Sequence, residues 1–335
     1  MTEIRKDYLL DKWVIVATER GKRPSDFKFD RDRRDEVEKC PFCPGNEDMT
    51  PPASMVYIPK NGEITVDKDS DGFRHRGWAL RVVRNLYPAL SPMDRFEEFS
   101  EGLTVWRTGT GEHEVIIETP KHDEHIQVSD EKQAHLVFRA YLERFNALKR
   151  LPFVKYVSII RNYGKAAGAS LTHPHSQLIA VPMIPERIAE EVKVCEDSWN
   201  GDTCIYDHVI ESESGSERFI SENKSAVAFC PFASTRSFEV WILPKRHLHN
   251  IAQLTEEELR DLASLTRRIL NAYHRVLGDP PYNYCFQQTI NNERYHLQVR
   301  LYPRLIIHAG FEINTGIIIN PMKPEDAARY LREAV

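Results

Sequence analysis

The chain has 335 residues, which suffices for one large or two medium domains, and its 41% apolar and 28% charged residues are ordinary for a soluble globular protein. The net charge of −5, with both signs mixed along the chain, gives no support for nucleic-acid binding. No apolar run approaches about 18 residues and the N-terminus does not resemble a signal peptide, so we expect a cytoplasmic protein without a membrane partner.

The N-terminal part of the chain alternates short strands with polar turns. We expect a strand at residues 13–17, followed at 18–24 by a turn that carries three cations. Arg20 in this turn has two interpretations: a solvated loop residue, or a clamp that grips phosphate oxygens in a bidentate manner. Further along, the pattern predicts a hairpin within residues 60–72 and a strand at 81–90 that runs into a proline turn.

The sequence CPFC at residues 40–43 is a CxxC motif. This spacing lets two thiolates bind one zinc ion, which needs two more nitrogen or sulfur ligands. A buried pair and a redox-active pair are the alternatives, although the loop that follows lacks the βαβ pattern of a thioredoxin-like site. The chain has no second CxxC, so we expect His173 and His122 to complete the site. The other four cysteines are expected to be ordinary core or loop thiols.

The middle of the chain contains a histidine-rich stretch between two apolar runs. A strand at residues 113–122 and a helix at 130–149 come first, and the following pattern predicts strand, glycine-containing loop and strand over 154–181. We expect the last strand to begin at the histidines. Because side chains alternate along a strand, His173, His175 and Gln177 would then share one face. The loop before them has backbone amides suited to phosphate oxygens.

The second part of the chain repeats the first at an interval of about 125 residues. His122 and His247 are 125 positions apart, and each follows an apolar strand and precedes an amphipathic helix. The second helix opens with a capping box at residues 255–258. The sequence His296-Leu297-Gln298 lies where the first copy has His173-Pro174-His175, so Gln298 takes the place of His175. We expect the first copy to carry the chemistry and the second to supply scaffold and substrate contacts.

The histidine row has the residue types for covalent nucleotidyl transfer. A neutral imidazole held in one tautomer can attack an α-phosphate and form a nucleotidyl-histidine. Loop amides, a glutamine and cations can hold the phosphate oxygens during the transfer. His175, Gln177, Ser170, Gly168 and Arg20 fit these roles, and the alternative for His175 is a structural or metal-binding histidine.

These motifs resemble the galactose-1-phosphate uridylyltransferase family, in the transferase branch of the histidine triad superfamily. The resemblance covers nearly the whole chain, and HPHSQ at 173–177 together with CPFC at 40–43 is its specific part. It implies that His175 is the nucleophile that takes up the uridylyl group. It further implies one zinc per chain bound by Cys40, Cys43, His122 and His173, and substrate contacts from Arg20, Asn85, Asn162, Gly168, Ser170, Gln177, Phe311 and Glu312.

The resemblance also implies the architecture. We expect an α+β protein with a duplicated histidine-triad-like fold, in which antiparallel half-barrel sheets are flanked by helices. Residues 1–185 would form the half with the zinc site and the nucleophile, and residues 186–335 a degenerate repeat. Members of this family are homodimers whose active sites use residues from both chains, so we expect a homodimer here.

The chain departs from the family pattern at several positions. Some members bind a second metal through a glutamate and three histidines, but the histidine positions here are Gln287, Gln298 and Arg300, so we expect no second metal. Leu86 stands where an acid helps to hold the ribose. The segment 310–321 instead looks like a branch that includes an ADP-glucose phosphorylase.

Our main hypothesis is therefore uridylyl transfer from UDP-glucose to galactose 1-phosphate, a step of galactose metabolism, by a ping-pong mechanism. The alternatives are adenylyl transfer of the ADP-glucose phosphorylase type, a nucleotide hydrolase, and a non-catalytic zinc-binding module. The expected partners are a nucleotide sugar and a sugar 1-phosphate or phosphate.

Overall fold

The computed structural model describes residues 2–17, 23–27, 37–93 and 96–335, and the structural statements below concern these residues. Arg20, the expected phosphate clamp, lies outside them. The main sheet contains eleven of the described strands, and all of their pairings are antiparallel. Their spatial order is β11 (Phe219–Glu222), β12 (Ala226–Phe229), β13 (Val240–Pro244), β15 (Gln298–Pro303), β14 (Tyr282–Gln287), β9 (Tyr156–Tyr163), β10 (His175–Val181), β8 (Glu112–Ile117), β5 (Leu80–Arg84), β3 (Met55–Lys60) and β4 (Glu63–Asp67).

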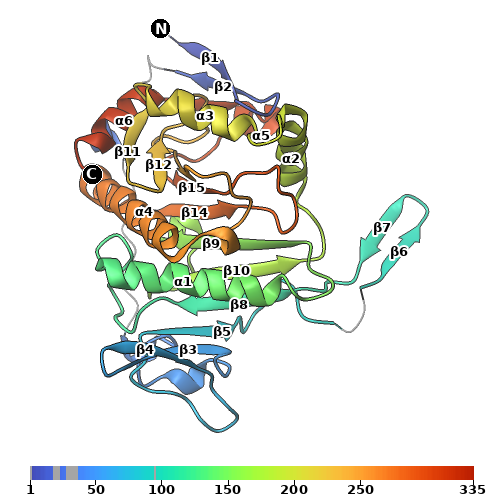
Figure 1. The fold of residues 1–335 in the computed structure, drawn as a ribbon, viewed down its shortest axis with the longest axis vertical. Helices are drawn as coiled ribbons and strands as arrows, with labels where there is room; N and C mark the ends of the chain where they lie inside the picture. The colour runs from blue at the N-terminus through green and yellow to red at the C-terminus, as the bar shows by residue number, and fades with distance from the viewer. Residues whose placement is uncertain (1, 18–22, 28–36, 94–95) are drawn as a thin grey trace.

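The remaining elements lie around this sheet (Figure 1). A small sheet contains β1 (Glu3–Lys6), β2 (Trp13–Val16) and β16 (Ile318–Asn320), and a hairpin of β6 (Glu98–Glu101) and β7 (Thr104–Arg107) projects from the body. The helices are α1 (Glu131–Leu148), α2 (Glu186–Ser198), α3 (Ile205–Ser214), α4 (Glu256–Leu277), α5 (Gly310–Thr315) and α6 (Pro324–Arg332). Among the described helices, none has the length and apolar character needed to cross a membrane.

The strand order repeats outward from the centre of the sheet. Strands β9 and β14 pair with each other, and on either side the order is β9-β10-β8 and β14-β15-β13. The helix α1 follows β8 in the chain, α4 follows β13, and the two helices pack together across one face of the sheet (Figure 1). The predicted α+β fold with a duplicated antiparallel sheet is confirmed, whereas the division at residue 185 stays a prediction.

Both central helices begin at residues that cap them. The Asp130 side chain accepts a hydrogen bond from the Gln133 backbone at the start of α1. At the start of α4, Thr255 and Glu258 form the capping box predicted from the sequence, each satisfying the other's backbone N–H. The apolar stripes of both helices are buried in one core that extends across the two halves of the sheet. This core fixes the strands that carry the site.

The predicted strand at the histidines begins two residues later than expected. The strand β10 starts at His175, and His173 lies in the turn before it. Pro174 has no N–H for a strand ladder, and its carbonyl accepts a hydrogen bond from the Glu118 backbone at 3.0 Å. The prediction that His173 shares a strand face with His175 and Gln177 is therefore wrong. Because His173 lies outside the strand, its ring can face Cys43 instead of the side chains of β10.

Candidate active site and metal centre

His175 is held as a neutral imidazole in one tautomer. The side chain is buried at the first position of β10, and its Nδ1 lies 2.8 Å from the backbone oxygen of His173. A carbonyl oxygen can only accept, so Nδ1 carries the proton and the lone pair is on Nε2. Burial lowers the pKa of His175, which keeps the ring uncharged at neutral pH. The result is a ring nitrogen with the electronic state that a nucleophile requires.

Gln177 follows His175 on the same face of β10 and contacts His113 of β8, which Asn85 also contacts. The Gln177 Oε1 atom lies 2.7 Å from Nε2 of His113 on β8. The amide nitrogen of Asn85, just beyond β5, lies 3.1 Å from the same Nε2. The predicted contacts Asn85 and Gln177 are thus brought together. His113, which joins them, was missed because a lone histidine in a strand has no motif around it.

The loop before the histidines has backbone conformations that only glycine adopts easily, at Gly164 and Gly168. Gly168 has φ +88°, in the left-handed region, and a Cβ there would face the Asn162 amide nitrogen at 3.9 Å. The Asn162 oxygen accepts from Asn283 of β14 at 2.8 Å. Ser170 is exposed in the same loop. Strand β14 therefore connects the second half of the chain to the predicted phosphate loop.

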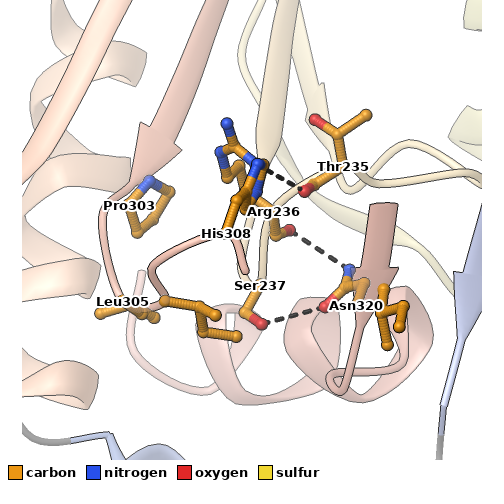
Figure 2. A pocket seen from close by; sticks show the side chains of 9 residues that line it. Thr235, Arg236, Ser237, Pro303, Leu305, His308 and Asn320 are labelled. Atoms are coloured by element: carbon orange, nitrogen blue, oxygen red, sulfur yellow. Dashed lines mark hydrogen bonds between the residues drawn. The ribbon is translucent and has the colours of Figure 1, made fainter. Parts of the chain in front are cut away.

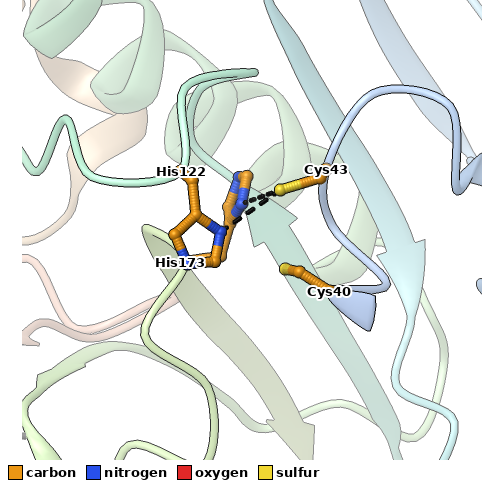
Figure 3. Close-up of side chains that lie close together, drawn as sticks. All are labelled: Cys40, Cys43, His122 and His173. Atoms are coloured by element: carbon orange, nitrogen blue, oxygen red, sulfur yellow. Dashed lines mark hydrogen bonds between the residues drawn. The ribbon is translucent and has the colours of Figure 1, made fainter. Parts of the chain in front are cut away.

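Four buried side chains form the predicted metal-binding group (Figure 3). One ligand atom from each of Cys40, Cys43, His122 and His173 lies within 4.8 Å of every other. The Cys43 sulfur lies 3.2 Å from Nδ1 of His122 and 3.5 Å from Nδ1 of His173. Bond lengths of about 2.3 Å to sulfur and 2.0 Å to nitrogen give S–N separations of about 3.5 Å in a tetrahedral zinc site. The donor set and its spacing therefore fit one metal ion.

The surrounding groups orient the His173 imidazole for binding. His173 Nε2 lies 2.8 Å from the Thr119 carbonyl oxygen, so Nε2 is protonated and the Nδ1 lone pair faces the cysteines. Burial lowers the pKa of His173 to about 4, which keeps the ring neutral. Burial, with the neighbouring Cys40 thiol, raises the pKa of Cys43 to about 12. A metal cation would reverse that effect and hold both sulfurs as thiolates.

A buried ion pair that the sequence did not reveal lies near His175. Arg161 on β9 and Glu118, just after β8, are both fully buried, and Arg161 Nε lies 2.9 Å from the nearer carboxylate oxygen. Although burial is the main cause of the lowered pKa of His175, Glu118 raises that pKa and Arg161 lowers it further. Single charged residues in apolar strands give no sequence signal for such a pairing.

The predicted sugar contacts lie apart from this group. Phe311 and Glu312 are in the short helix α5, away from β10 in Figure 1. The Phe311 side chain is 44% exposed, and Glu312 accepts a hydrogen bond from the Ala309 backbone. Near α5, a small pocket lies between residues 235–237 and residues 303–308 (Figure 2). Within one chain the structure does not bring Phe311 and Glu312 to His175.

The second half contains a related group of potential ligands. Cys204, Asp207 and His247 offer ligand atoms within 4.8 Å of one another. The Asp207 carboxylate lies 2.9 Å from Nδ1 of His247 and 3.7 Å from Nε2 of the buried His296. Although burial opposes it, the hydrogen bond to Asp207 raises the pKa of His247 to about 10. The expectation that Cys204 is an ordinary thiol overlooked these neighbours, because the spacing Cys-x-x-Asp is not a recognised motif.

Comparison with known proteins identifies the family. Residues 109–334 match the family described as "Domain of unknown function (DUF4921)". ADP-glucose phosphorylase from Arabidopsis thaliana is 34% identical over 346 residues, which cover 99% of this chain and 92% of that protein. Galactose-1-phosphate uridylyltransferase from Thermotoga maritima is 30% identical over 351 residues, covering 99% and 98%. The chain belongs to the family of these nucleotide-sugar enzymes.

Solved structures agree with this family membership. The crystal structure of the Arabidopsis thaliana ADP-glucose phosphorylase with bound ADP-glucose has a TM-score of 0.80, 31% identity and full coverage of both chains. The predicted family is confirmed at the level of nucleotidyltransferases that include ADP-glucose phosphorylases and galactose-1-phosphate uridylyltransferases. The narrower choice of a uridylyltransferase is not confirmed, because the ADP-glucose phosphorylase has the higher identity of these two relatives.

Proposed function

We propose that the chain is a nucleotidyltransferase of the ADP-glucose phosphorylase type that works through a covalent adenylyl-histidine at His175. The observation that carries this proposal is the hydrogen bond from His175 Nδ1 to the His173 carbonyl at 2.8 Å. It leaves a lone pair on Nε2 of a neutral, buried ring. An acceptor carbonyl at Nδ1 also stabilises the positive charge that the ring develops when Nε2 attacks.

The reaction proceeds in two successive nucleophilic displacements at the α-phosphorus. The Nε2 lone pair of His175 attacks the α-phosphorus of ADP-glucose, forms a P–N bond, and releases glucose 1-phosphate as the P–O bond breaks. Inorganic phosphate then attacks the same phosphorus, the P–N bond breaks, and ADP leaves with a neutral histidine restored. Gln177 and the amides of the 162–170 loop would hold the phosphate oxygens in both steps.

The metal-binding group has a supporting role in this proposal. Cys40, Cys43, His122 and His173 would hold one zinc ion, whose chemistry here is to crosslink the CPFC loop to the turn before β10. His173 is the shared element, since its ring faces the ligand group and its carbonyl holds His175. Fixing His173 therefore fixes the tautomer and direction of the nucleophile.

The choice of base and acceptor rests on the relatives. The higher identity to the ADP-glucose phosphorylase favours an adenine nucleotide and phosphate. Leu86 agrees, because an apolar, exposed side chain stands where the best-known uridylyltransferases have an acid. Uridylyl transfer to galactose 1-phosphate remains the second candidate, supported by the 30% identity to the Thermotoga maritima enzyme.

We further propose that the working unit is a homodimer. Phe311 and Glu312 lie in an exposed helix, which is apart from the strand that begins at His175 of the same chain (Figure 1). The sugar end of the site would then be completed by α5 of a second copy. A Glu312→Ala variant mixed with a His175→Ala variant should recover activity in hybrid dimers, because one of the two sites would then have both intact residues.

The covalent intermediate provides the direct test. Purified protein mixed with ADP-glucose alone should gain one nucleotidyl group by intact mass, and the group should be lost in acid. His175→Ala should gain none, while His208→Ala, which removes an exposed histidine on α3, should react like wild type. An unmodified wild-type chain, or a modified His175→Ala chain, would rule the mechanism out.

A donor and acceptor panel separates the candidates. ADP-glucose and UDP-glucose are compared at equal concentration, each with phosphate, galactose 1-phosphate or water as acceptor. We expect ADP-glucose with phosphate to react fastest. A preference for UDP-glucose with galactose 1-phosphate would return the assignment to a uridylyltransferase, and steady release of nucleotide without an acceptor would indicate a hydrolase.

A further inference from the structure

The side-chain amide of Gln177 can be presented to a ligand in two opposite ways. With its nitrogen outward it donates hydrogen bonds to a phosphate, and with its oxygen outward it repels one. The backbone pairing of Gln177 with Val115 of β8 does not select either orientation, because it leaves the side-chain amide free to rotate. The deciding contact is with His113, whose Nε2 lies 2.7 Å from Gln177 Oε1.

The tautomer of His113 follows from its other ring nitrogen. The backbone N–H of Ala89 donates to Nδ1 of His113 at 3.1 Å. An N–H donor requires a lone pair, so Nδ1 is unprotonated and the neutral ring carries its proton on Nε2. The Nε2–H group then needs an acceptor, and Gln177 Oε1 supplies it. The Gln177 oxygen is therefore held against His113, and its NH₂ group faces the other way.

The side-chain amide of Asn85 is also oriented by a hydrogen bond. Its Oδ1 accepts a hydrogen bond from the Tyr87 backbone at 2.9 Å, so its NH₂ group points towards the same side of His113. The Asn85 nitrogen lies 3.1 Å from His113 Nε2, and because an amide NH₂ cannot accept a hydrogen bond, it does not compete for the Nε2–H group. Gln177 Oε1 is therefore the acceptor for His113 Nε2–H.

We propose that His113 is a positioning residue that fixes Gln177 as a hydrogen-bond donor to the phosphate oxygens of the nucleotide sugar. This inference rests on the proposed function, since it assigns the direction of one group in that reaction. The ring sits on β8, buried and locked by Ala89, so it holds the amide without rotating itself. A donor fixed before the substrate arrives loses little conformational freedom in the transition state.

Three variants distinguish the roles of the two ring nitrogens of His113. His113→Asn keeps an acceptor near the position of Nδ1 for Ala89 but removes the donor to Gln177. His113→Gln places an N–H near the position of Nε2, and His113→Phe keeps the ring without either nitrogen. We expect Asn and Phe to slow adenylyl-His175 formation by about ten- to a hundredfold, and Gln to stay within about fivefold of wild type. The concentration of ADP-glucose that gives half the maximal rate should change much less than the maximal rate of adduct formation.

A double-mutant cycle distinguishes positioning from a merely structural role. In a Gln177→Ala background the donor is gone, so His113→Asn should change the rate by less than about threefold. Equal losses in both backgrounds, or an unchanged rate in His113→Asn, would overturn the inference. Thermal unfolding identifies a misfolded variant, in which case the Gln and Phe variants carry the comparison. Absence of the adduct in wild type would instead reject the proposed function itself.

Discussion

The two halves of the chain use the same backbone arrangement at the start of equivalent strands, with different side chains. In β10, His175 Nδ1 donates to the His173 carbonyl at 2.8 Å, and in β15, Gln298 Nε2 donates to the His296 carbonyl at 3.1 Å. The hydrogen bond is retained, but an amide has no second nitrogen with a free lone pair. The duplicated frame therefore positions a donor in both halves, and only the imidazole offers a lone pair for the proposed nucleophilic attack.

The ligand groups differ in the same way. The first half has two thiols and two imidazoles, whereas the second has Asp207 where the spacing Cys40-x-x-Cys43 would place its second cysteine. That carboxylate already forms an ion pair with His247, whose pKa is raised to about 10. A metal in the second group would have to displace this proton and break the ion pair, whereas in the first group it would replace thiol protons and hold the sulfurs as thiolates. The aspartate therefore exchanges a sulfur ligand for a carboxylate that already has a partner.

The largest expected effect comes from moving the imidazole between halves. His175→Ala should lower the rate of adduct formation at least a thousandfold, because no other described group replaces Nε2. Adding Gln298→His should not restore it, since residue 298 is fully buried and its oxygen accepts from Arg300 Nε at 2.6 Å. Intact mass after incubation with ADP-glucose measures both variants. An adduct in the double variant would show that the two strand starts are functionally interchangeable.

The next largest effect is expected for the ligand groups. Cys43→Ser should release about one metal equivalent per chain and lower the free energy of unfolding by about 3 kcal/mol or more. Cys204→Ser should keep the metal of the first half and cost about 1 kcal/mol, because its neighbours remain ion-paired. Metal analysis after dialysis against a chelator, with urea unfolding, measures both. Full retention of metal in Cys43→Ser would contradict the assignment of the first group.

The contrast between the halves also explains what could be predicted from sequence. The strands, the helix α4 with its capping box, and the CPFC pair follow from periodicity and motifs that are local in the chain, whereas the full set of four predicted metal ligands came with the family resemblance. His113 and Asp207 were missed because their roles depend on partners 64 and 40 positions away, which no spacing rule connects. Arg20 lies outside the described residues. Phe311 and Glu312 stay predictions, because they lie in α5, apart from β10.

A smaller effect is expected from the buried ion pair of the second half. Although burial opposes it, the Arg300 charge lowers the pKa of Glu191 to about 2. A carboxyl group whose pKa is lower in the folded than in the unfolded protein stabilises the fold at pH values above its unfolded-state pKa, near 4.5. This stabilisation is lost as the pH falls towards the folded-state pKa. Between pH 5 and pH 3 the loss should be about 2 kcal/mol.

Urea unfolding at several pH values measures this loss, with Glu191→Gln as the control. The variant is less stable at neutral pH, because Arg300 loses its partner, but its stability should depend less on pH between 5 and 3. An equal slope in both proteins would mean that Glu191 is not the carboxylate whose protonation weakens the second half in acid.

The smallest expected effect tests whether the halves unfold together. Asp130→Ala removes the cap of α1 and Thr255→Ala removes that of α4, and each should cost about 1 kcal/mol. The halves share a continuous sheet, the helices pack together, and Tyr141 of α1 bonds Tyr284 of β14 at 2.6 Å between hydroxyl oxygens. We therefore expect both variants to lower one common thermal transition. Two transitions, each moved by only one variant, would instead support independent domains divided near residue 185.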